Sequence, residues 1–393
     1  MIYLEILLAF LKLGCTSFGG PVAHLGYFRA EFVARRRWLE DAAYADLVAL
    51  CQFLPGPTSS QVVFALGRQR GGWPGGLLAS LAFTLPSALL MILAGSGLAA
   101  LGDLTRAGWL HGLQLAAVAV VAQAVWNMGR NLCPDFPRVL IALVAAAGLV
   151  GGQNALLQIA VLAGGAVAGW LIFQKQIPAA ANPVVAGRQS HWVAGTVLVL
   201  FFCLLVFLPL LAALTGNHAV AVFTGFYRAG ALVFGGGHVV LPLLRAEVVP
   251  NGWVDDPTFL AGYGLAQAVP GPLFTFAGYL GAVLTPAHPW LGGGGGLLAI
   301  FLPGWLLIGG AQPFWQTLRP RTWAQAALRG ANAAVVGVLL AALVQPVIST
   351  SVRGGLDAVT AVVALVLLQR FKVPPWLVVL LAAAAGQWLL AMP

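Results

Sequence analysis

The chain has 393 residues, of which 60% are hydrophobic and only 8% are charged. A soluble domain carries about 25% charged residues, so this little charge cannot cover a water-exposed globule of this size. Apolar runs near or above the roughly 18-residue length of a membrane-spanning helix recur throughout. The sequence therefore predicts an all-α, multi-pass membrane protein and leaves no room for a soluble domain.

The net charge of +9 does not indicate nucleic-acid binding, because the arginines are scattered between apolar runs and form no patch. Short loops rich in Lys and Arg are typical of the cytoplasmic side of membrane proteins. The four cysteines, Cys15, Cys51, Cys133 and Cys203, are far apart and form no CxxC pair. We therefore expect no metal site, no disulfide and no cofactor.

Thirteen apolar segments are expected to cross the membrane, with one linking segment between two sets of six. In chain order they are 2–20, 42–67, 75–101, 108–128, 137–151, 153–173, 192–214, 219–236, 258–284, 292–312, 325–347, 355–369 and 375–391. They divide the chain into a first repeat at 1–174, a polar linker with its connecting helix at 175–216, and a second repeat at 217–393.

The second half of the chain repeats the first in the same order, with an offset that drifts only from 215 to 218. The matches are Phe18-Gly19-Gly20 with Phe234-Gly235-Gly236, Arg29-Ala30-Glu31 with Arg245-Ala246-Glu247, Gln52 with Gln267, Pro55-Gly56-Pro57 with Pro270-Gly271-Pro272, Pro86 with Pro303, and Gly112 with Gly330. Six crossings per repeat plus one linking helix turn the second repeat upside down. Inverted repeats are typical of secondary transporters whose substrate site lies near the midplane between the repeats.

The loop cations do not settle the orientation. Thirteen full crossings put most of them on the side of the N-terminus, namely Arg68, Arg70, Arg130, Arg138, Lys175, Arg188, Arg245, Arg319, Arg321, Arg370 and Lys372. The opposite side receives Arg29, Arg35, Arg36, Arg37, Arg106 and Arg353. If the Pro-Gly-Pro segments are re-entrant hairpins, the parity changes and the repeats become parallel, so the topology stays open.

Gly-Gly-Pro and Pro-Gly-Pro interrupt helices, and here they fall inside apolar runs. Within a bilayer, non-helical backbone is tolerated only where it is buried in protein or lines a cavity. Each break should start a new half-helix, with Pro21 and Pro57 in its first turn. The free amides and the helix dipole at such a start favour an anion. A single break is more often a packing kink, but two symmetric pairs favour a binding site.

Polar side chains beside the breaks are further candidates. Thr58 and Ser59 follow the first Pro-Gly-Pro and could donate hydrogen bonds to a substrate. Gln52 and Gln267 each lie three residues before a Pro-Gly-Pro, and could bond either the freed carbonyl groups or a substrate oxygen. The second copy offers fewer hydroxyl donors, since Leu273 follows its Pro-Gly-Pro.

Two pairs of cations recur in both repeats. Lys12 and Arg228 each lie seven residues before the first glycine of their Phe-Gly-Gly motif, and Arg29 matches Arg245. These cations either reach an interface or line an anion path to the breaks, and we favour the path because both copies keep them. Glutamine at Lys12 or Arg228 is then expected to abolish transport.

Glu31 and Glu247 follow Arg29 and Arg245 by two residues, so they point to different sides of a helix and are not obvious local ion pairs. They could pair across the repeats, take up a coupling proton or be ordinary helix-end charges. The chain contains no Walker motif, HExxH, Gly-x-Ser-x-Gly or mid-span pair of aspartates. The sequence therefore predicts a transporter and not an enzyme.

The segments FLKLGCTSFGGPVAHLGYFRAEFV and QFLPGPTSSQVVFALG of the first half, with FGGGHVVLPLLRAEVV and QAVPGPLFTFAGYLG of the second, resemble the chromate ion transporter family in its long, two-domain form. The resemblance implies export of chromate from the bacterial cytoplasm across the inner membrane, driven by an ion gradient and giving chromate resistance. It also implies that Phe18 to Pro21 and Pro55 to Pro57 are signature motifs. The second copy departs from the pattern at Gly237, which stands where the first copy has Pro21.

The residues themselves indicate an anion but do not choose among anions. Chromate and sulfate are both tetrahedral dianions, and no motif separates them. The alternatives are therefore a sulfate or other oxyanion carrier and an uncoupled anion channel. The expected partners are the oxyanion and the lipid bilayer, and the oligomeric state stays open, with a homodimer as one option.

Overall fold

The computed structural model of the chain describes residues 1–101, 108–150, 155–176, 191–234, 237–315 and 320–391. Every regular element in these ranges is a helix, as the composition predicts. Six of the described helices are long and apolar enough to cross a membrane, namely Thr58–Gly97, Gly108–Leu132, Ala155–Phe173, His191–Thr215, Pro289–Phe314 and Thr322–Ser351. The protein is therefore an all-α, multi-pass membrane protein.

The first repeat contains helices α1 to α7. Their bounds are α1 Ile2–Thr16, α2 Gly20–Phe28 with a π-helical continuation Arg29–Arg35, α3 Asp41–Phe53, α4 Thr58–Leu101, α5 Gly108–Leu132, α6 Phe136–Val150 and α7 Ala155–Phe173 with a 3₁₀ turn Gln174–Gln176. The linking helix α8 is His191–Thr215.

The second repeat follows the same plan. Its bounds are α9 His218–Leu232, a 3₁₀ turn Gly237–Val239, α10 Val240–Val248, α11 Asp256–Ala268, a 3₁₀ turn Leu273–Thr275, α12 Phe276–Leu284, α13 Pro289–Ala311 with a 3₁₀ turn Gln312–Phe314, α15 Thr322–Ala342 with a π-helical continuation Leu343–Ile348, α16 Ser349–Ser351, α17 Gly355–Gln369 and α18 Pro375–Ala391. Asn217 and Asp255 cap α9 and α11 by accepting hydrogen bonds from backbone amides of the first turn.

The chain reverses direction at the first Phe-Gly-Gly motif, and it reverses again between α9 and α10. Glu5, near the start of α1, accepts a hydrogen bond from Trp38 Nε1 at 3.1 Å and pairs with Arg36 at 3.4 Å, although both partners follow α2. The chain therefore enters along α1 and returns to the same end. In the second repeat, His218 at the start of α9 lies against Trp253, which follows α10, with ring centroids 5.0 Å apart.

Each Pro-Gly-Pro motif also reverses the chain. Arg70 lies 3.3 Å from Glu5, so the chain after the first Pro-Gly-Pro runs back to the end where α3 began. A second reversal follows at Gly71–Gly72 inside α4, where Gly72 has a φ of +65° that favours glycine. In the second repeat, the Tyr279 hydroxyl of α12 donates to the Thr258 carbonyl near the start of α11 at 3.0 Å.

The expected full crossings at 2–20, 42–67, 219–236 and 258–284 are therefore wrong, since these segments belong to hairpins. In three of these segments glycines with positive φ, namely Gly19 with Gly20, Gly56 and Gly271, turn the backbone back, where a proline alone would kink a continuous helix. Because both motifs of each repeat form hairpins, the parity is unchanged, and the parallel alternative does not arise.

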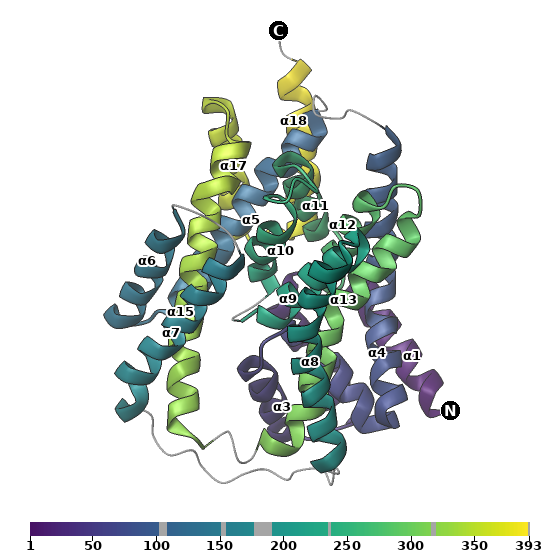
Figure 1. Ribbon diagram of the computed structural model, residues 1–393. Helices are drawn as coiled ribbons and strands as arrows, with labels where there is room; N and C mark the ends of the chain where they lie inside the picture. The colour runs from purple at the N-terminus through teal and green to yellow at the C-terminus, as the bar shows by residue number, and fades with distance from the viewer. Residues whose placement is uncertain (102–107, 151–154, 177–190, 235–236, 316–319, 392–393) are drawn as a thin grey trace.

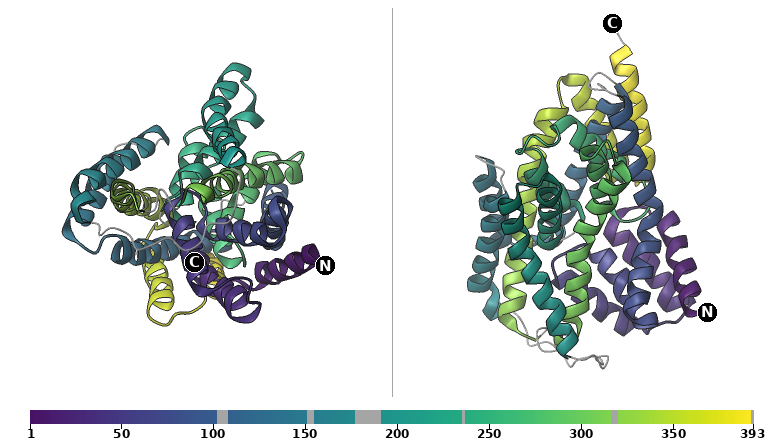
Figure 2. Two further views of the ribbon diagram at one scale, coloured as in Figure 1. Left: turned by 90° about the horizontal axis from the view of Figure 1, so that it is seen from below. Right: turned by 45° about the vertical axis from the view of Figure 1, so that its right-hand side comes forward.

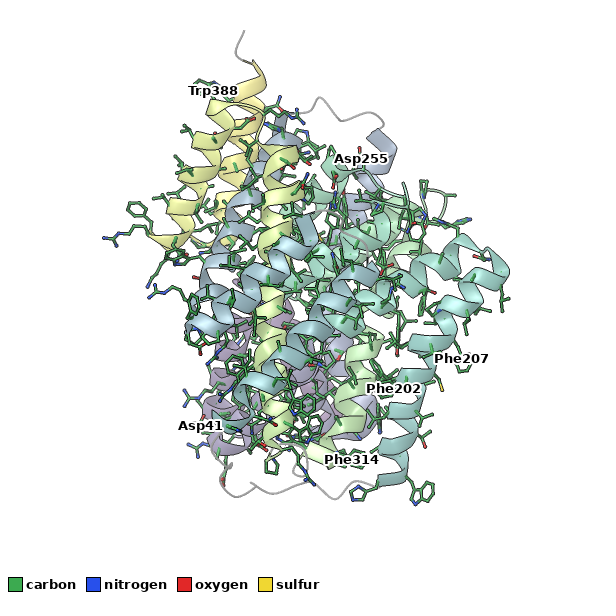
Figure 3. The ribbon with its side chains drawn as sticks, turned by 60° about the vertical axis from the view of Figure 1, so that its left-hand side comes forward. Asp41, Phe202, Phe207, Asp255, Phe314 and Trp388 are labelled. Atoms are coloured by element: carbon green, nitrogen blue, oxygen red, sulfur yellow. The ribbon has the colours of Figure 1, made fainter. Side chains whose placement is uncertain are left out.

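The two repeats are inverted. Figure 3 shows Asp41, at the start of α3, and Asp255, at the start of the equivalent α11, at opposite ends of the molecule. The two chain termini also lie towards opposite ends (Figure 1). Helix α8 connects the repeats from the edge of the bundle, where large apolar side chains such as Phe202 and Phe207 are exposed (Figures 2 and 3).

The repeats exchange their last helices. Gly112 of α5 packs against Gly386 of α18, and a Cβ on Gly386 would lie 2.6 Å from the Gly112 Cα atom. The equivalent Gly330 of α15 packs against Gly169 of α7, with a corresponding separation of 2.5 Å. Each crossing is close enough that only glycine fits, so the matched glycines hold the two repeats together.

Candidate functional site

The two kinds of break meet at the centre of the molecule through a symmetric pair of hydrogen bonds. The Gly56 amide donates to the Val233 carbonyl at 2.7 Å, and the Gly271 amide donates to the Ser17 carbonyl at 2.9 Å. Each bond joins the Pro-Gly-Pro of one repeat to the residue before the Phe-Gly-Gly of the other. Gly56 and Gly271 have φ values of +123° and +98°, which side chains oppose.

These bonds change the expected ligand set. The amides of Gly56 and Gly271 are occupied, so they cannot serve as free donors to an anion in this conformation. The start of α2 differs, because Gly19 caps it in a left-handed conformation and no side chain accepts from its first-turn amides. The first Phe-Gly-Gly is therefore a helix start whose cap residue leaves the first-turn amides without a side-chain acceptor.

A small chamber lies beside this helix start. Its volume is about 20 Å³, and Gly19, Gly20, Gln267 and Gly271 are among its walls. Space of this size holds about one water molecule. The chamber is therefore too small for a five-atom oxyanion in this conformation.

A larger cavity of about 720 Å³ adjoins the chamber, since Gly19, His238 and Pro375 line both. Polar side chains from both repeats reach it, namely Gln52, Gln123, Asn127, Asn131, His238 and Lys372. Among the described residues, no Asp or Glu lines either space. The absence of carboxylates together with amide and ammonium donors suits an anion.

Gln52 lines the larger cavity, and Gln267 lines the adjoining chamber. Both residues precede a Pro-Gly-Pro by three positions, and both line the connected cavities. The Gln267 Nε2 atom is buried and has no partner of hydrogen-bond geometry within the described part of the chain. It is therefore a donor still available to a ligand.

The sequence does not single out two of the lining residues, His238 and Lys372, as site residues. His238 has no equivalent in the first repeat, and its Nδ1 atom lies 2.9 Å from the hydroxyl of the buried Tyr263. Lys372 was counted among the loop cations, yet it lies at the tip between α17 and α18. The short apolar segments on either side of Lys372 could have indicated that the residue lies within the membrane. Helix α17 has 15 residues, which span only about 22 Å of a 30 Å hydrocarbon layer.

Several predicted residues support the breaks without lining the connected cavities. Ser59 is buried, and the Thr58 hydroxyl lies 3.5 Å from the Cys51 carbonyl. The Thr275 hydroxyl donates to the Pro272 carbonyl, which belongs to the second Pro-Gly-Pro, at 2.8 Å. The Phe18 ring lies 6.3 Å from the ring of Trp376 at the start of α18.

The remaining motif residues are accounted for as follows. Pro21 lies in the first turn of α2, as predicted. Pro57 precedes α4 and packs close to Gly304 of α13. Pro55 accepts a hydrogen bond from Gln61 at its carbonyl group, Pro270 precedes Gly271 in the second turn, and Phe234 is half-buried. Gly235 and Gly236 lie outside the described residues.

The first pair of repeated cations is not equivalent in the structure. Arg228 forms a two-pronged ion pair with Glu247, at 2.7 and 2.5 Å. Glu31, the equivalent of Glu247, is held instead by Arg35 at 3.0 Å and Arg36 at 2.6 Å. Lys12 is exposed on α1 and has no carboxylate within 4 Å among the described residues.

The second pair of repeated cations is equivalent. Arg29 pairs with Asp41 at 2.6 and 2.9 Å, and Arg245 pairs with Asp256 at 2.6 and 2.8 Å. Neither these arginines nor Lys12 and Arg228 are among the residues that line the connected cavities. These four cations therefore do not form an anion path along the connected cavities. Three of them are instead paired with carboxylates of other segments.

Comparison with known proteins agrees with these features. The sequence profile of the family described as chromate transporter matches residues 4–170 and 220–387, which are the two repeats. No solved structure was found that resembles the chain.

Three curated relatives cover much of the chain. A chromate transport protein of Pseudomonas aeruginosa is 32% identical over 72% of this chain and 67% of the relative. A probable chromate transport protein of Synechococcus elongatus is 29% identical over 85% and 82%, and a chromate transport protein of Cupriavidus metallidurans is 29% identical over 94% and 88%. The chain belongs to the chromate transporter family.

Proposed function

We propose that this protein is a secondary active transporter that exports chromate from the cytoplasm across the bacterial inner membrane and thereby gives chromate resistance. The names of its relatives supply the substrate, and a transporter of a tetrahedral dianion is consistent with the inverted fold. Transport would occur by alternating access, with the two repeats rearranging around the central breaks.

The observation that carries this proposal is the meeting of both breaks beside a cavity without carboxylates. The crossed bonds from Gly56 and Gly271 tie the interrupted backbone of each repeat to the other. A rearrangement of one repeat must therefore change the geometry at both breaks. The geometry of the substrate site would therefore change when either repeat moves.

The proposed ligands lie on both sides of the chamber. They are the first-turn amides of α2 with Gly19 and Gly20, and the side-chain amides of Gln52 and Gln267. The chamber has to widen before an oxyanion can reach the amides of α2. Glu31 and Glu247 remain candidates for coupling, since protonation of either carboxylate would weaken the arginine pairs that hold it.

The hairpins also suggest the orientation. The basic residues described at the end of the molecule that carries Asp41 include Arg29, Arg35, Arg36, Arg37, Arg68 and Arg70. Lys175 and Arg321 adjoin the ends of α7 and α15 that lie at the same end (Figure 1). The described loop arginines of the opposite end are Arg245 and Arg353. The reversals thus place Arg35–Arg37 on the same side as Lys175, and this end is proposed to be cytoplasmic by the positive-inside rule.

The test is uptake of labelled chromate into inverted membrane vesicles under an imposed ion gradient. Gradient-dependent accumulation that sulfate inhibits only weakly is the expected result. Equal transport of sulfate would replace chromate by a general oxyanion substrate. Conductance far above carrier turnover in electrical recordings would make the protein an uncoupled channel, and no accumulation in well-expressed vesicles would contradict the proposal.

A further inference from the structure

The tip between α17 and α18 lies beside α5. His111 of α5 lies 2.9 Å from Asp357 at the start of α17, and Gln369 at the end of α17 donates to Asn127 of α5 at 3.3 Å. Helix α17 therefore runs alongside α5, and α18 returns to the starting end, where Gly386 meets Gly108. The segment between these helices is the tip of a hairpin.

Lys372 occupies this tip and lines the larger cavity. Its φ of +54° is unusual for a residue with a side chain, so the surrounding contacts hold the backbone in an unfavourable conformation. Trp376, four residues on, approaches Phe18 of the first Phe-Gly-Gly motif. The tip is thus fixed beside the first break.

Helix α5 presents a row of amides to the same cavity. Gln123, Asn127 and Asn131 are spaced by four residues, which places them on one face of the helix, and all three line the cavity. Amide side chains on one face of a membrane helix can bond an ion or water along its length. With Lys372 opposite the helix, the row has both neutral donors and a positive charge.

Lys372 is exposed, and its surroundings differ from those of the partly buried arginines of this chain. Arg228 and Arg245 each face a carboxylate. Lys372 has no carboxylate within 4 Å among the described residues, and His238 is the other titratable group that lines the cavity. An ammonium group in a carboxylate-free cavity provides a charge that a dianion can neutralise.

We propose that Lys372 and the amide row of Gln123, Asn127 and Asn131 form an outer binding subsite for a tetrahedral dianion. The adjoining chamber is too small for such an ion here, so the outer subsite is where this conformation can hold it. The ammonium group selects for charge, and the amides supply hydrogen-bond donors. The inference rests on the proposed oxyanion transport and adds a second binding site on the path of the ion.

The test is isothermal titration calorimetry on the purified full chain in detergent, with sulfate and with chromate as the titrated ions. Lys372→Gln should weaken binding of both ions about tenfold, because one charged hydrogen-bonding partner is lost. Lys372→Arg should stay within about threefold of wild type, since it keeps the charge. Arg370→Gln is the matched control, because Arg370 lies on the same tip but does not line the cavity.

A second variant tests the contribution of the amide row to binding independently of Lys372. Asn127→Asp keeps the side-chain size and the acceptor for Gln369 but adds a negative charge, so it should weaken binding of both dianions. Unchanged thermal unfolding of each variant would show that the fold is intact.

Wild-type affinity in Lys372→Gln, or equal loss in Lys372→Gln and Arg370→Gln, would overturn the subsite. Binding of sulfate but not chromate, with the expected loss in Lys372→Gln, would keep the subsite and reject chromate as the substrate. If wild type binds neither ion, both the subsite and the proposed transport are rejected.

Discussion

The first and second repeats agree in their central backbone contacts and differ in their charge partners. Gly56 and Gly271 donate to equivalent carbonyl groups of the opposite repeat. By contrast, the equivalent carboxylates Glu31 and Glu247 bind arginines from non-equivalent positions, which are Arg36 in one repeat and Arg228 in the other.

The difference follows from what each interaction requires. A backbone bond at a left-handed glycine needs one residue type and one geometry, so few substitutions keep it. An ion pair needs only an opposite charge within a few ångströms, and an arginine from several positions can supply it. The repeats can therefore share their central breaks while their surrounding charges diverge, and within the described part of the chain Lys12 has no carboxylate partner.

The largest effect should come from breaking the ion pair of the second repeat. Arg228→Gln leaves Glu247, whose side chain is only 6% exposed, without its arginine, and should destabilise the fold by about 3–5 kcal/mol. Lys12→Gln should change stability little, because Glu31 keeps Arg35 and Arg36. The stability of both variants is measured by thermal unfolding in detergent, with size-exclusion chromatography used to detect the protein that remains folded.

Arg228→Gln combined with Glu247→Gln is the control, since it removes the unpaired charge and should recover part of the stability. Equal destabilisation by Lys12→Gln and Arg228→Gln would contradict the asymmetry and restore the symmetric role that the sequence predicts for these cations.

A smaller loss should follow from separating the exchanged helices. A Cβ on Gly165 of α7 would overlap Ala334 of α15, so Gly165→Ala should destabilise the protein by about 1–3 kcal/mol. The adjacent Gly164 has no atom within 4 Å of its Cβ position, which makes Gly164→Ala a matched control expected to be neutral or slightly stabilising. Thermal unfolding compares the two, and equal midpoints would show that α7 does not pack as described.

The next effect is strain at the crossed bonds. Gly56→Ala and Gly271→Ala each place a side chain at positive φ, which costs about 1–2 kcal/mol. Each single variant should lower chromate uptake into vesicles to a similar extent. Gly216→Ala is the control, because Gly216 has a φ of +59° in the loop before α9 and no atom within 4 Å of its Cβ position. Its strain is smaller, because +59° lies in the left-handed region that residues with side chains can adopt, and it is outside the breaks, so uptake should be retained. Loss in only one of the two central variants would show that the breaks are not equivalent.

Much of this fold could be predicted from the sequence, because hydrophobicity and the repeated motifs depend on local residue types. The helical class and the inversion both follow from such patterns. The sequence left hairpins open as an alternative at the Pro-Gly-Pro segments and could not choose, since glycine and proline interrupt a helix in the same way whether the chain continues or reverses. The partners of Arg29 and Arg245 escaped notice for a different reason, as Asp41 and Asp256 lie on the next helix in the chain.

The smallest effect concerns the ion pair that both repeats keep. The side chains of Arg29 and Asp41 are 63% and 58% exposed, whereas those of Arg245 and Asp256 are 14% and 23% exposed. Water and salt screen the first pair more, so a double-mutant cycle should give it a smaller coupling energy than the second. The cycles use Arg→Gln and Asp→Asn at each pair and are repeated at high salt, where the first coupling should vanish. Equal couplings would mean that the pairs share one environment, which would contradict the burial of the second repeat around α10 and α11.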